Sequence, residues 1–170
     1  IVMELEARYN VAPTQIVPVV VAGGNGSRRL VHMRWGLVPN WATTLDVGYR
    51  MINARAETAA EKQAFGESLR QRRCVVAADG FYEWQKTAGG KQPYLLRLLD
   101  GAPFGFAGLW DCWRDPRGSL LETFTIVTTT ANTLVQTIHD RMPVILNRRH
   151  REEWLTPRIE VHALKRLCEP

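Results

Sequence analysis

Short runs of apolar and β-branched residues, divided by glycine, proline and polar turns, occur along most of the chain. Residues 16–22 form one such run, and residues 29–35 return from the glycine-rich turn that follows it, which predicts a β-hairpin. The same pattern predicts further strands over residues 74–78, 81–84, 93–98, 104–113, 122–130 and 142–146. The polar stretches 87–91 and 115–118 fit the turns between two pairs of these strands.

Helical spacing is confined to a few segments. Residues 56–70 place apolar side chains near a period of about 3.6, with acidic residues toward the N-terminal end, which predicts a helix. Residues 148–155 predict a second helix, which Pro157 ends, and residues 161–167 a third; residues 132–138 fit a short helix or a turn. Many short strands and no βαβ alternation favour one α+β domain over residues 1–170, with a mixed or antiparallel sheet curled into a β-barrel-like core and flanking helices.

Composition narrows the class of protein only slightly. Hydrophobic residues make up 45% of the 170 residues and charged residues 23%, as in ordinary globular proteins. No apolar run approaches the roughly 18 residues that span a bilayer, so we expect no membrane partner and a cytoplasmic, nucleoid-associated location. The net charge of +5 favours a polyanionic partner, although many basic proteins bind none.

The three cysteines are Cys74, Cys112 and Cys168; their odd number argues against a disulfide framework, and their wide spacing excludes a CxxC zinc motif. We interpret them as buried or idle thiols. Histidines and carboxylates show no metal-ligand spacing either, and the glycines at 23–26 are not followed by the Lys-Ser/Thr pair of a phosphate-binding loop. The sequence therefore predicts neither a metal nor a cofactor.

Polar residues stand in four segments where apolar ones are expected, and Glu83 belongs to one of them. It lies between Tyr82 and Trp84 at the start of a predicted strand. A carboxylate enclosed by aromatic rings loses hydration, which raises its pKa and suits it to acid–base chemistry near neutral pH. The alternative is a solvent-facing position on an alternating strand, on the same face as Phe81.

His139 stands at the end of a predicted element, beside Asp140 and Arg141. A histidine in such a setting can transfer protons near neutral pH, whereas the alternative is a structural histidine bonded to a neighbouring backbone group. A Ser-His-Asp hydrolase is not predicted, because no serine stands in a nucleophile-elbow sequence.

Asn53 and Arg55 alternate along the chain, so both side chains point to one face if the segment is extended. An amide beside a guanidinium can read an anion or a base edge; the alternative is the N-terminal region of a helix, where such residues cap and pair. Trp35 and Trp41 bracket a Gly/Pro turn. We interpret Trp35 as a core residue, whereas Trp41 fits equally a core position and a loop position that stacks on a nucleobase.

Taken together, these segments resemble the SRAP family (SOS response-associated peptidase). The matching stretches follow the family's order between residues 8 and 155; they are Arg8-Tyr-Asn-Val-Ala-Pro13, Trp35-Gly-Leu-Val-Pro-Asn-Trp41, Met51-Ile-Asn-Ala-Arg-Ala-Glu-Thr58, Arg73-Cys-Val-Val-Ala-Ala-Asp-Gly-Phe-Tyr-Glu-Trp84, Gln92-Pro-Tyr94, Phe106-Ala-Gly-Leu-Trp110, Thr125-Ile-Val-Thr-Thr129 and Ile138-His-Asp-Arg-Met-Pro143. The resemblance implies one α+β domain around a β-barrel-like core. It also implies a positively charged groove that holds single-stranded DNA, often at a junction with duplex.

The resemblance further implies covalent trapping of abasic sites. Family members begin with Met-Cys-Gly-Arg, and removal of the methionine leaves a cysteine with a free α-amine. That amine condenses with the aldehyde of a ring-opened abasic site to a Schiff base, and the thiol then closes a thiazolidine.

Site residues follow from the resemblance by position. Asn53 would hold the amine and the sugar, Glu83 would move protons, and His139 would assist opening of the deoxyribose ring. Contacts to the DNA backbone or the abasic sugar would come from Asn10, Arg55 and Arg141. A wedge that kinks the strand would be shaped by Pro13, Pro39 and Trp41.

The sequence departs from the family at its start, because Met-Cys-Gly-Arg and most of the following helical segment are missing, and its C-terminal end is short. Cys74 cannot replace the missing cysteine, since it lies inside a predicted strand and has no α-amine. We expect the native protein to carry the missing segment, and a polypeptide without it to be inactive in crosslinking.

The leading hypothesis is a monomeric abasic-site sensor that crosslinks itself to single-stranded DNA, with associated lyase and self-processing peptidase activities. One alternative is a non-catalytic single-stranded DNA-binding protein. The other is a thiol peptidase that acts on other proteins, although the sequence indicates no oxyanion hole for it.

Overall fold

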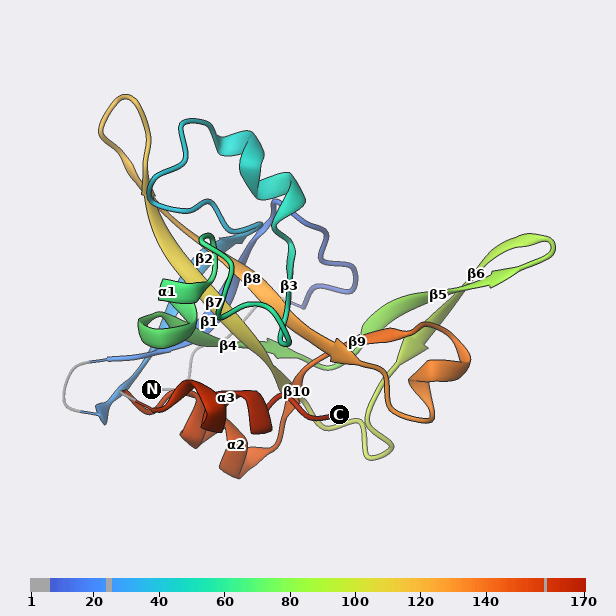
Figure 1. The fold of residues 1–170 in the computed structure, drawn as a ribbon. Coiled ribbons are helices and arrows are strands. Elements are labelled where there is room, and N and C mark those ends of the chain that lie inside the picture. The colour runs from blue at the N-terminus through green and yellow to red at the C-terminus, as the bar shows by residue number, and fades with distance from the viewer. Residues whose placement is uncertain (1–6, 24–25, 158) are drawn as a thin grey trace.

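A computed structural model describes residues 7–23, 26–157 and 159–170 of the chain. Among these residues, five strands pair around a closed ring (Figure 1). The ring runs through β7 (Phe104–Arg114), β4 (Arg73–Ala78), β1 (Ile16–Ala22), β2 (Arg28–Trp35) and β8 (Leu120–Thr130), and β8 pairs back with β7. These pairings are antiparallel, except that β2 runs parallel to β8. The expected α+β fold with a mixed sheet curled on itself is confirmed.

The hairpins of the ring follow the sequence pattern closely. In β1, Val17, Val19 and Val21 are buried, while the residues between them are half-buried. The predicted turn at residues 115–118 joins β7 to β8, where one carboxylate oxygen of Asp115 accepts hydrogen bonds from the amides of Arg117 and Ser119 at 2.9 and 2.7 Å. Alternation and turn chemistry therefore sufficed to predict these elements.

Three short strands extend the ring on either side of β8 and β7. β3 (Asn53–Arg55) runs parallel to β8, β9 (Arg141–Pro143) pairs antiparallel with β8, and β10 (Ile145–Leu146) pairs with β7. The prediction of one strand over residues 142–146 is wrong, because the chain crosses from β8 to β7 at Val144. The Val144 amide donates to Val127 of β8, and its carbonyl accepts from Ala107 of β7, both at 2.9 Å.

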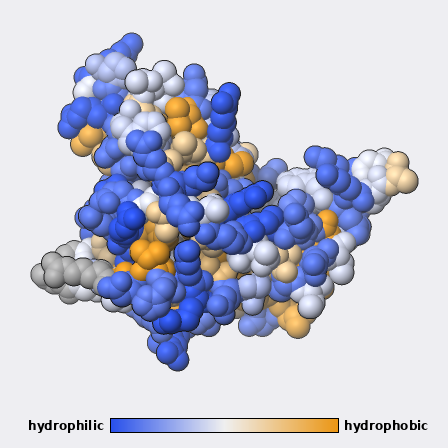
Figure 2. All heavy atoms as spheres, viewed as in Figure 1, coloured by the Kyte–Doolittle hydropathy of each residue, from blue (hydrophilic) through white to orange (hydrophobic). Residues whose placement is uncertain are grey.

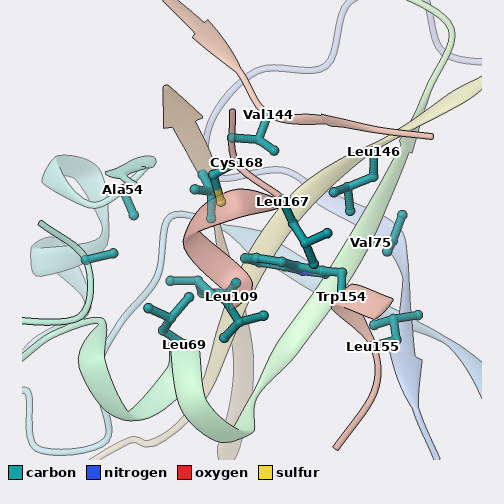
Figure 3. Close-up of a cluster of buried hydrophobic side chains, with 14 of the residues drawn as sticks. Ala54, Leu69, Val75, Leu109, Val144, Leu146, Trp154, Leu155, Leu167 and Cys168 are labelled. Atoms are coloured by element: carbon teal, nitrogen blue, oxygen red, sulfur yellow. The ribbon is translucent and has the colours of Figure 1, made fainter. Parts of the chain in front are cut away.

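Two apolar clusters lie on opposite faces of β4. Cys74 and Val76 pack with the valines of β1 and with Phe106, whereas Val75 faces the second cluster, shown in Figure 3. Trp154, at the end of α2 (Arg148–Trp154), occupies this second cluster and is fully buried. Its indole nitrogen donates to the carbonyls of Cys74 and Gly108 at 3.0 and 3.3 Å. The helix α3 (Val161–Arg166) adds Leu164 to the same cluster.

The segment after β3 does not form the long helix predicted over residues 56–70. Only α1 (Gly66–Gln71) is α-helical, and residues 56–65 form a series of turns. The helical spacing reflects packing of Ala59 and Phe65 against the core rather than a continuous helix. Gly66 approaches the Ala60 carbonyl so closely that a Cβ atom there would lie 2.8 Å from the oxygen, so the chain folds back on itself at this point.

An arm made of β5 (Phe81–Thr87) and β6 (Gly90–Leu96) projects away from the ring (Figure 1). It forms a separate two-stranded sheet, and Phe81 anchors its base by an edge-to-face contact with Phe106 at 5.9 Å. Short 3-10 helices, η2 (Leu45–Arg50) and η3 (Val135–Thr137), follow β2 and β8 in the chain. None of the helices formed by described residues is long and apolar enough to cross a membrane.

Candidate nucleic-acid interface

The extended β3 presents Asn53 and Arg55 on one exposed face, as their alternation predicts. Ala54, between them, is buried against the core. The parallel pairing with β8 sets Asn53 opposite Ile126 and Arg55 opposite Thr128 and thus fixes the register of both side chains. The alternative of a helical N-terminal region is therefore wrong.

Trp41 joins these two residues in the lining of one cavity of about 360 Å³. Trp41 is 50% exposed, so the loop interpretation of this tryptophan holds and the core interpretation does not. Trp35, by contrast, is half-buried and stacks on Phe124 with an interplanar angle of 12°, as expected of a core residue. The cavity thus combines an exposed indole with an amide and a guanidinium.

Lys62 also lines this cavity, together with the apolar residues Met51 and Phe65 and the polar residues Thr58 and Gln63. Sequence reasoning missed Lys62, because it placed the residue on a regular helix. Arg55 and Lys62 give the cavity two cationic groups and favour an anionic ligand. On the face shown in Figure 2, hydrophilic residues predominate and hydrophobic ones form small separate patches.

Pro39 lies in the turn that precedes Trp41. It is buried, and its carbonyl accepts the Ala42 amide at 2.9 Å, which closes the turn that presents Trp41. The Asn40 amide donates to Asp111 at 3.1 Å and ties the same turn to β7. Pro39 thus belongs to the turn that presents Trp41, and a contribution of this turn to a wedge remains a prediction.

Arg141 holds a carboxylate instead of pointing into open solvent. Its guanidinium donates to both oxygens of Glu57, at 2.7 and 3.0 Å, and to the Thr128 carbonyl at 2.8 Å. The hydrogen bonds from Arg141 hold the pKa of the Glu57 carboxyl below its ordinary value. A DNA contact by Arg141 remains a prediction, and it would compete with this ion pair.

Glu83 is half-buried on β5, and the aromatic residues on its face are Phe81 and the directly opposite Tyr94, not Tyr82 and Trp84. Alternation along β5 places Tyr82 and Trp84 on the opposite, exposed face, while Glu83 shares its face with Phe81 and Gln85. The carboxylate of Glu83 accepts the Trp84 amide at 3.0 Å. The interpretation as an alternating strand position on the face of Phe81 is therefore correct, but the side chain is half-buried rather than solvent-facing.

His139 lies beside the arm, on the loop that precedes β9. Its Nδ1 accepts the Arg141 amide at 3.0 Å and lies 3.1 Å from a carboxylate oxygen of Asp140. The backbone bond that we considered as the structural alternative is thus present. The Arg141 carbonyl also lies 3.3 Å from Nδ1, so this nitrogen accepts from the Arg141 amide in one neutral tautomer and can donate to an oxygen in the other.

Gln85 connects the arm to this loop. Its side-chain amide donates to the Thr137 carbonyl at 2.7 Å, two residues before His139. Because Gln85 and Glu83 share one face of β5, this contact turns that face toward the His139 loop. Arg141 then links the His139 loop to the turn after β3, since its amide binds His139 and its guanidinium binds Glu57.

Asn10 and Pro13 belong to the segment before β1. Asn10 is exposed and Pro13 is half-buried. The Tyr82 hydroxyl contacts the Tyr9 carbonyl at 3.5 Å, which places Asn10 next to the arm. Arg8 is engaged with the carbonyl of Ile16 at 2.6 Å and with the side chain of Gln15.

The three thiols are free and poorly suited to nucleophilic chemistry. Burial raises the pKa of Cys74 strongly and that of Cys168 to about 12. The pKa of Cys112 is also raised, by burial and by the nearby carboxylates of Glu122 and Asp111. The described residues contain no cluster of three or more His, Cys, Asp or Glu side chains that could hold a metal ion.

The sequence of this chain matches a known protein family. The family described as SOS response associated peptidase (SRAP) matches residues 2–170. The chain belongs to the SRAP family. The resemblance inferred from the motifs is thereby confirmed over nearly the whole length of this SRAP chain.

Relatives of this SRAP chain carry informative names. The abasic site processing protein YoqW of Bacillus subtilis (strain 168) is 46% identical over 169 residues, which cover 98% of this chain and 75% of that protein. The abasic site processing protein HMCES of Gallus gallus is 37% identical over 183 residues and is matched over 53% of its length by 86% of this chain.

Solved structures share the fold of this SRAP chain. A protein from Bacteroides thetaiotaomicron is 32% identical and superposes with a TM-score of 0.86 over 92% of this chain and 69% of that one. A protein from Bordetella bronchiseptica is 27% identical, with a TM-score of 0.84 over 98% of this chain and 84% of that one.

Proposed function

We propose that this SRAP protein binds single-stranded DNA and processes abasic sites in it. The observation that carries the proposal is the cavity that gathers Trp41, Asn53, Arg55 and Lys62 on one exposed face. An indole can stack on a base, and two cations can hold phosphates on either side of a gap in the stack. Support also comes from relatives named abasic site processing proteins.

The proposed binding of DNA does not depend on the base sequence. Arg55 and Lys62 would bind phosphate oxygens, contacts that position a strand without identifying its bases. Trp41 would occupy the place of the missing base or stack on its neighbour. Asn53, on the same face as Arg55, would hydrogen-bond the abasic sugar. Selectivity for the abasic site would come from the low cost of unstacking at that position.

Covalent capture is the second part of the proposal, for a polypeptide that begins with cysteine. Its α-amine would attack the abasic aldehyde and lose water to form a C=N bond, and its thiol would add across that bond, with the thiol proton passing to nitrogen. Glu83 and His139 would move the protons, since Gln85 turns the face of Glu83 toward the His139 loop. Cys74, Cys112 and Cys168 are internal residues and supply no α-amine.

One alternative is supported by a specific observation. The cavity that carries Trp41, Arg55 and Lys62 could hold a single strand by stacking and phosphate contacts alone, so this alternative is binding of DNA without a covalent bond. Peptidase activity on other proteins has less support, since the two most buried thiols have raised pKa values. We also propose that the protein is a monomer that acts on the nucleoid.

The test compares two polypeptides on single-stranded DNA with and without an abasic site. One is the 170-residue chain, and the other carries an N-terminal cysteine exposed by methionine removal. We expect salt-dependent binding by both and a band that survives denaturing electrophoresis for the second alone. Binding without such a band would leave the non-covalent binder, and absence of binding by both would overturn the proposal.

A further inference from the structure

One face of the arm carries exposed side chains in three rows. Alternation places every second residue of β5 on that face, and each lies directly opposite a residue of β6. Residues directly opposite in an antiparallel pair project to the same side of a sheet. From base to tip, the rows are Tyr82 with Leu95, Trp84 with Pro93, and Lys86 with Lys91. We call these six residues the aromatic strip.

Folding alone does not explain the aromatic strip. Trp84 is 47% exposed, Tyr82 is 42% exposed and Leu95 is 50% exposed. Figure 1 shows the arm standing clear of the ring, and no described element other than β5 and β6 belongs to their two-stranded sheet. Such a hairpin is stabilised little by rings that face water. A contiguous exposed apolar patch typically marks a binding surface.

The lysine pair at the end of the strip identifies the charge of the ligand. Lys86 and Lys91 lie directly opposite one another, an arrangement of like charges that destabilises a sheet. Neither lysine forms an ion pair with any described residue of the chain. A polyanion laid across the pair would offset this repulsion, whereas an apolar protein partner would bury it.

We propose that the aromatic strip binds the nucleotides that flank the abasic site in single-stranded DNA. Bases would stack on Tyr82 and Trp84, whose ring centroids are 6.4 Å apart, and phosphates would bind Lys86 and Lys91. Glu83 lies between the two aromatic residues on the other face of β5. The outer edge of β5 pairs with no described strand, so a DNA strand held at Glu83 can continue around that edge. This inference rests on the proposed function.

The first test compares a short oligodeoxynucleotide that ends beside the abasic site with longer ones. The longer ones are extended by several nucleotides on the 5′ side or on the 3′ side of the abasic site, and each is measured separately. The Lys86→Gln/Lys91→Gln double variant should bind the short oligonucleotide like the wild type. On one of the two extended oligonucleotides, the slope of log affinity against log salt concentration should be shallower for the double variant than for the wild type by about 1.4. This figure corresponds to two lost phosphate contacts at about 0.7 each. Equal losses on the short and extended forms would overturn the inference.

The matched control changes the same net charge elsewhere. Lys165 and Arg166 are exposed on α3, far from the arm in Figure 1. The Lys165→Gln/Arg166→Gln variant should retain the wild-type salt dependence on the extended oligonucleotide. A loss in this control as large as that in the arm variant would show a net-charge effect and would also overturn the inference.

The second test addresses stacking. Trp84→Ala should weaken binding of the extended oligonucleotide at least about fivefold, whereas Trp84→Phe keeps a ring and should retain most of the affinity. Unchanged binding of the short oligonucleotide shows that neighbouring Glu83 is undisturbed. Iodouracil placed beside the abasic site should photocrosslink to Tyr82 or Trp84.

The outcomes separate the inference from the proposed function. Wild-type protein that binds no single-stranded DNA overturns both. Wild-type binding with unchanged affinities in the arm variants, or photocrosslinks that map only to other residues, overturns the aromatic strip alone and leaves the arm as a surface for a protein partner.

Discussion

Arg141 binds the carboxylate of Glu57 through two hydrogen bonds, of 2.7 and 3.0 Å, and so ties β9 to the turn that follows β3. The same guanidinium donates to the Thr128 carbonyl of β8, which lies between these two strands. Its backbone amide binds His139. One residue therefore fixes the position of the His139 loop relative to the strand that carries Asn53 and Arg55.

Glu57→Gln should lower the free energy of unfolding near neutral pH by at most about 1 kcal/mol, because Glu57 is about half exposed and exposed ion pairs are weak. Arg141 holds the pKa of Glu57 below 4.5. The stabilisation is therefore present above 4.5 and is lost as the pH falls through the lower folded-state pKa. Urea unfolding should show the difference from the wild type near neutral pH and none in strong acid.

Glu61→Gln is the matched control for this variant, since Glu61 is exposed and forms no ion pair with a described residue. It should unfold like the wild type at every pH. A Glu57→Gln difference that persists in strong acid would contradict the assignment of the effect to the ion pair with Arg141.

Trp154 and Trp41 should separate stability from binding. Trp154→Ala removes a fully buried indole with two hydrogen bonds and should cost about 3–5 kcal/mol in urea unfolding. Trp41→Ala removes a half-exposed ring and should change stability by no more than about 0.5 kcal/mol. Trp41→Ala should nevertheless weaken binding to abasic single-stranded DNA, measured by fluorescence anisotropy. Unchanged binding would remove Trp41 from the proposed interface.

The five strands of the ring and the shared face of Asn53 and Arg55 could be predicted from the sequence, because both depend on patterns within a few residues. The cavity could not, since Lys62 reaches it only through the non-helical turns between β3 and α1. The ion pair between Arg141 and Glu57 joins residues 84 positions apart, and local patterns carry no signal for it. Tyr82 and Trp84 do not enclose Glu83 as expected, because sequence neighbours on a strand point to opposite faces.

Arg55 should contribute to affinity without base specificity. Arg55→Gln should weaken binding to all single-stranded sequences alike and make the salt dependence of log affinity shallower by about 0.7, the loss of one phosphate contact. Arg117→Gln is the matched control, because Arg117 is exposed in the turn between β7 and β8. If Arg55→Gln changed the preference among base sequences instead, Arg55 would read base edges.

Glu83 and His139 should affect the rate of capture more than affinity. In a polypeptide with an N-terminal cysteine, Glu83→Gln should slow crosslinking and its reversal by about 10²–10⁴-fold, the usual contribution of a positioned acid or base. Binding should be retained, because the change removes only a charge from a half-buried side chain. His139→Gln should slow capture of the closed sugar but act less on an abasic analogue already in the aldehyde form.

The measurement is the crosslinking rate at one pH on denaturing gels. Glu122→Gln, the same change as Glu83→Gln but on β8 outside the proposed site, should leave this rate unchanged. Equal slowing of closed and open substrates by His139→Gln would mean that His139 only positions its loop through the Arg141 amide, the structural role that its Nδ1 contact already supports.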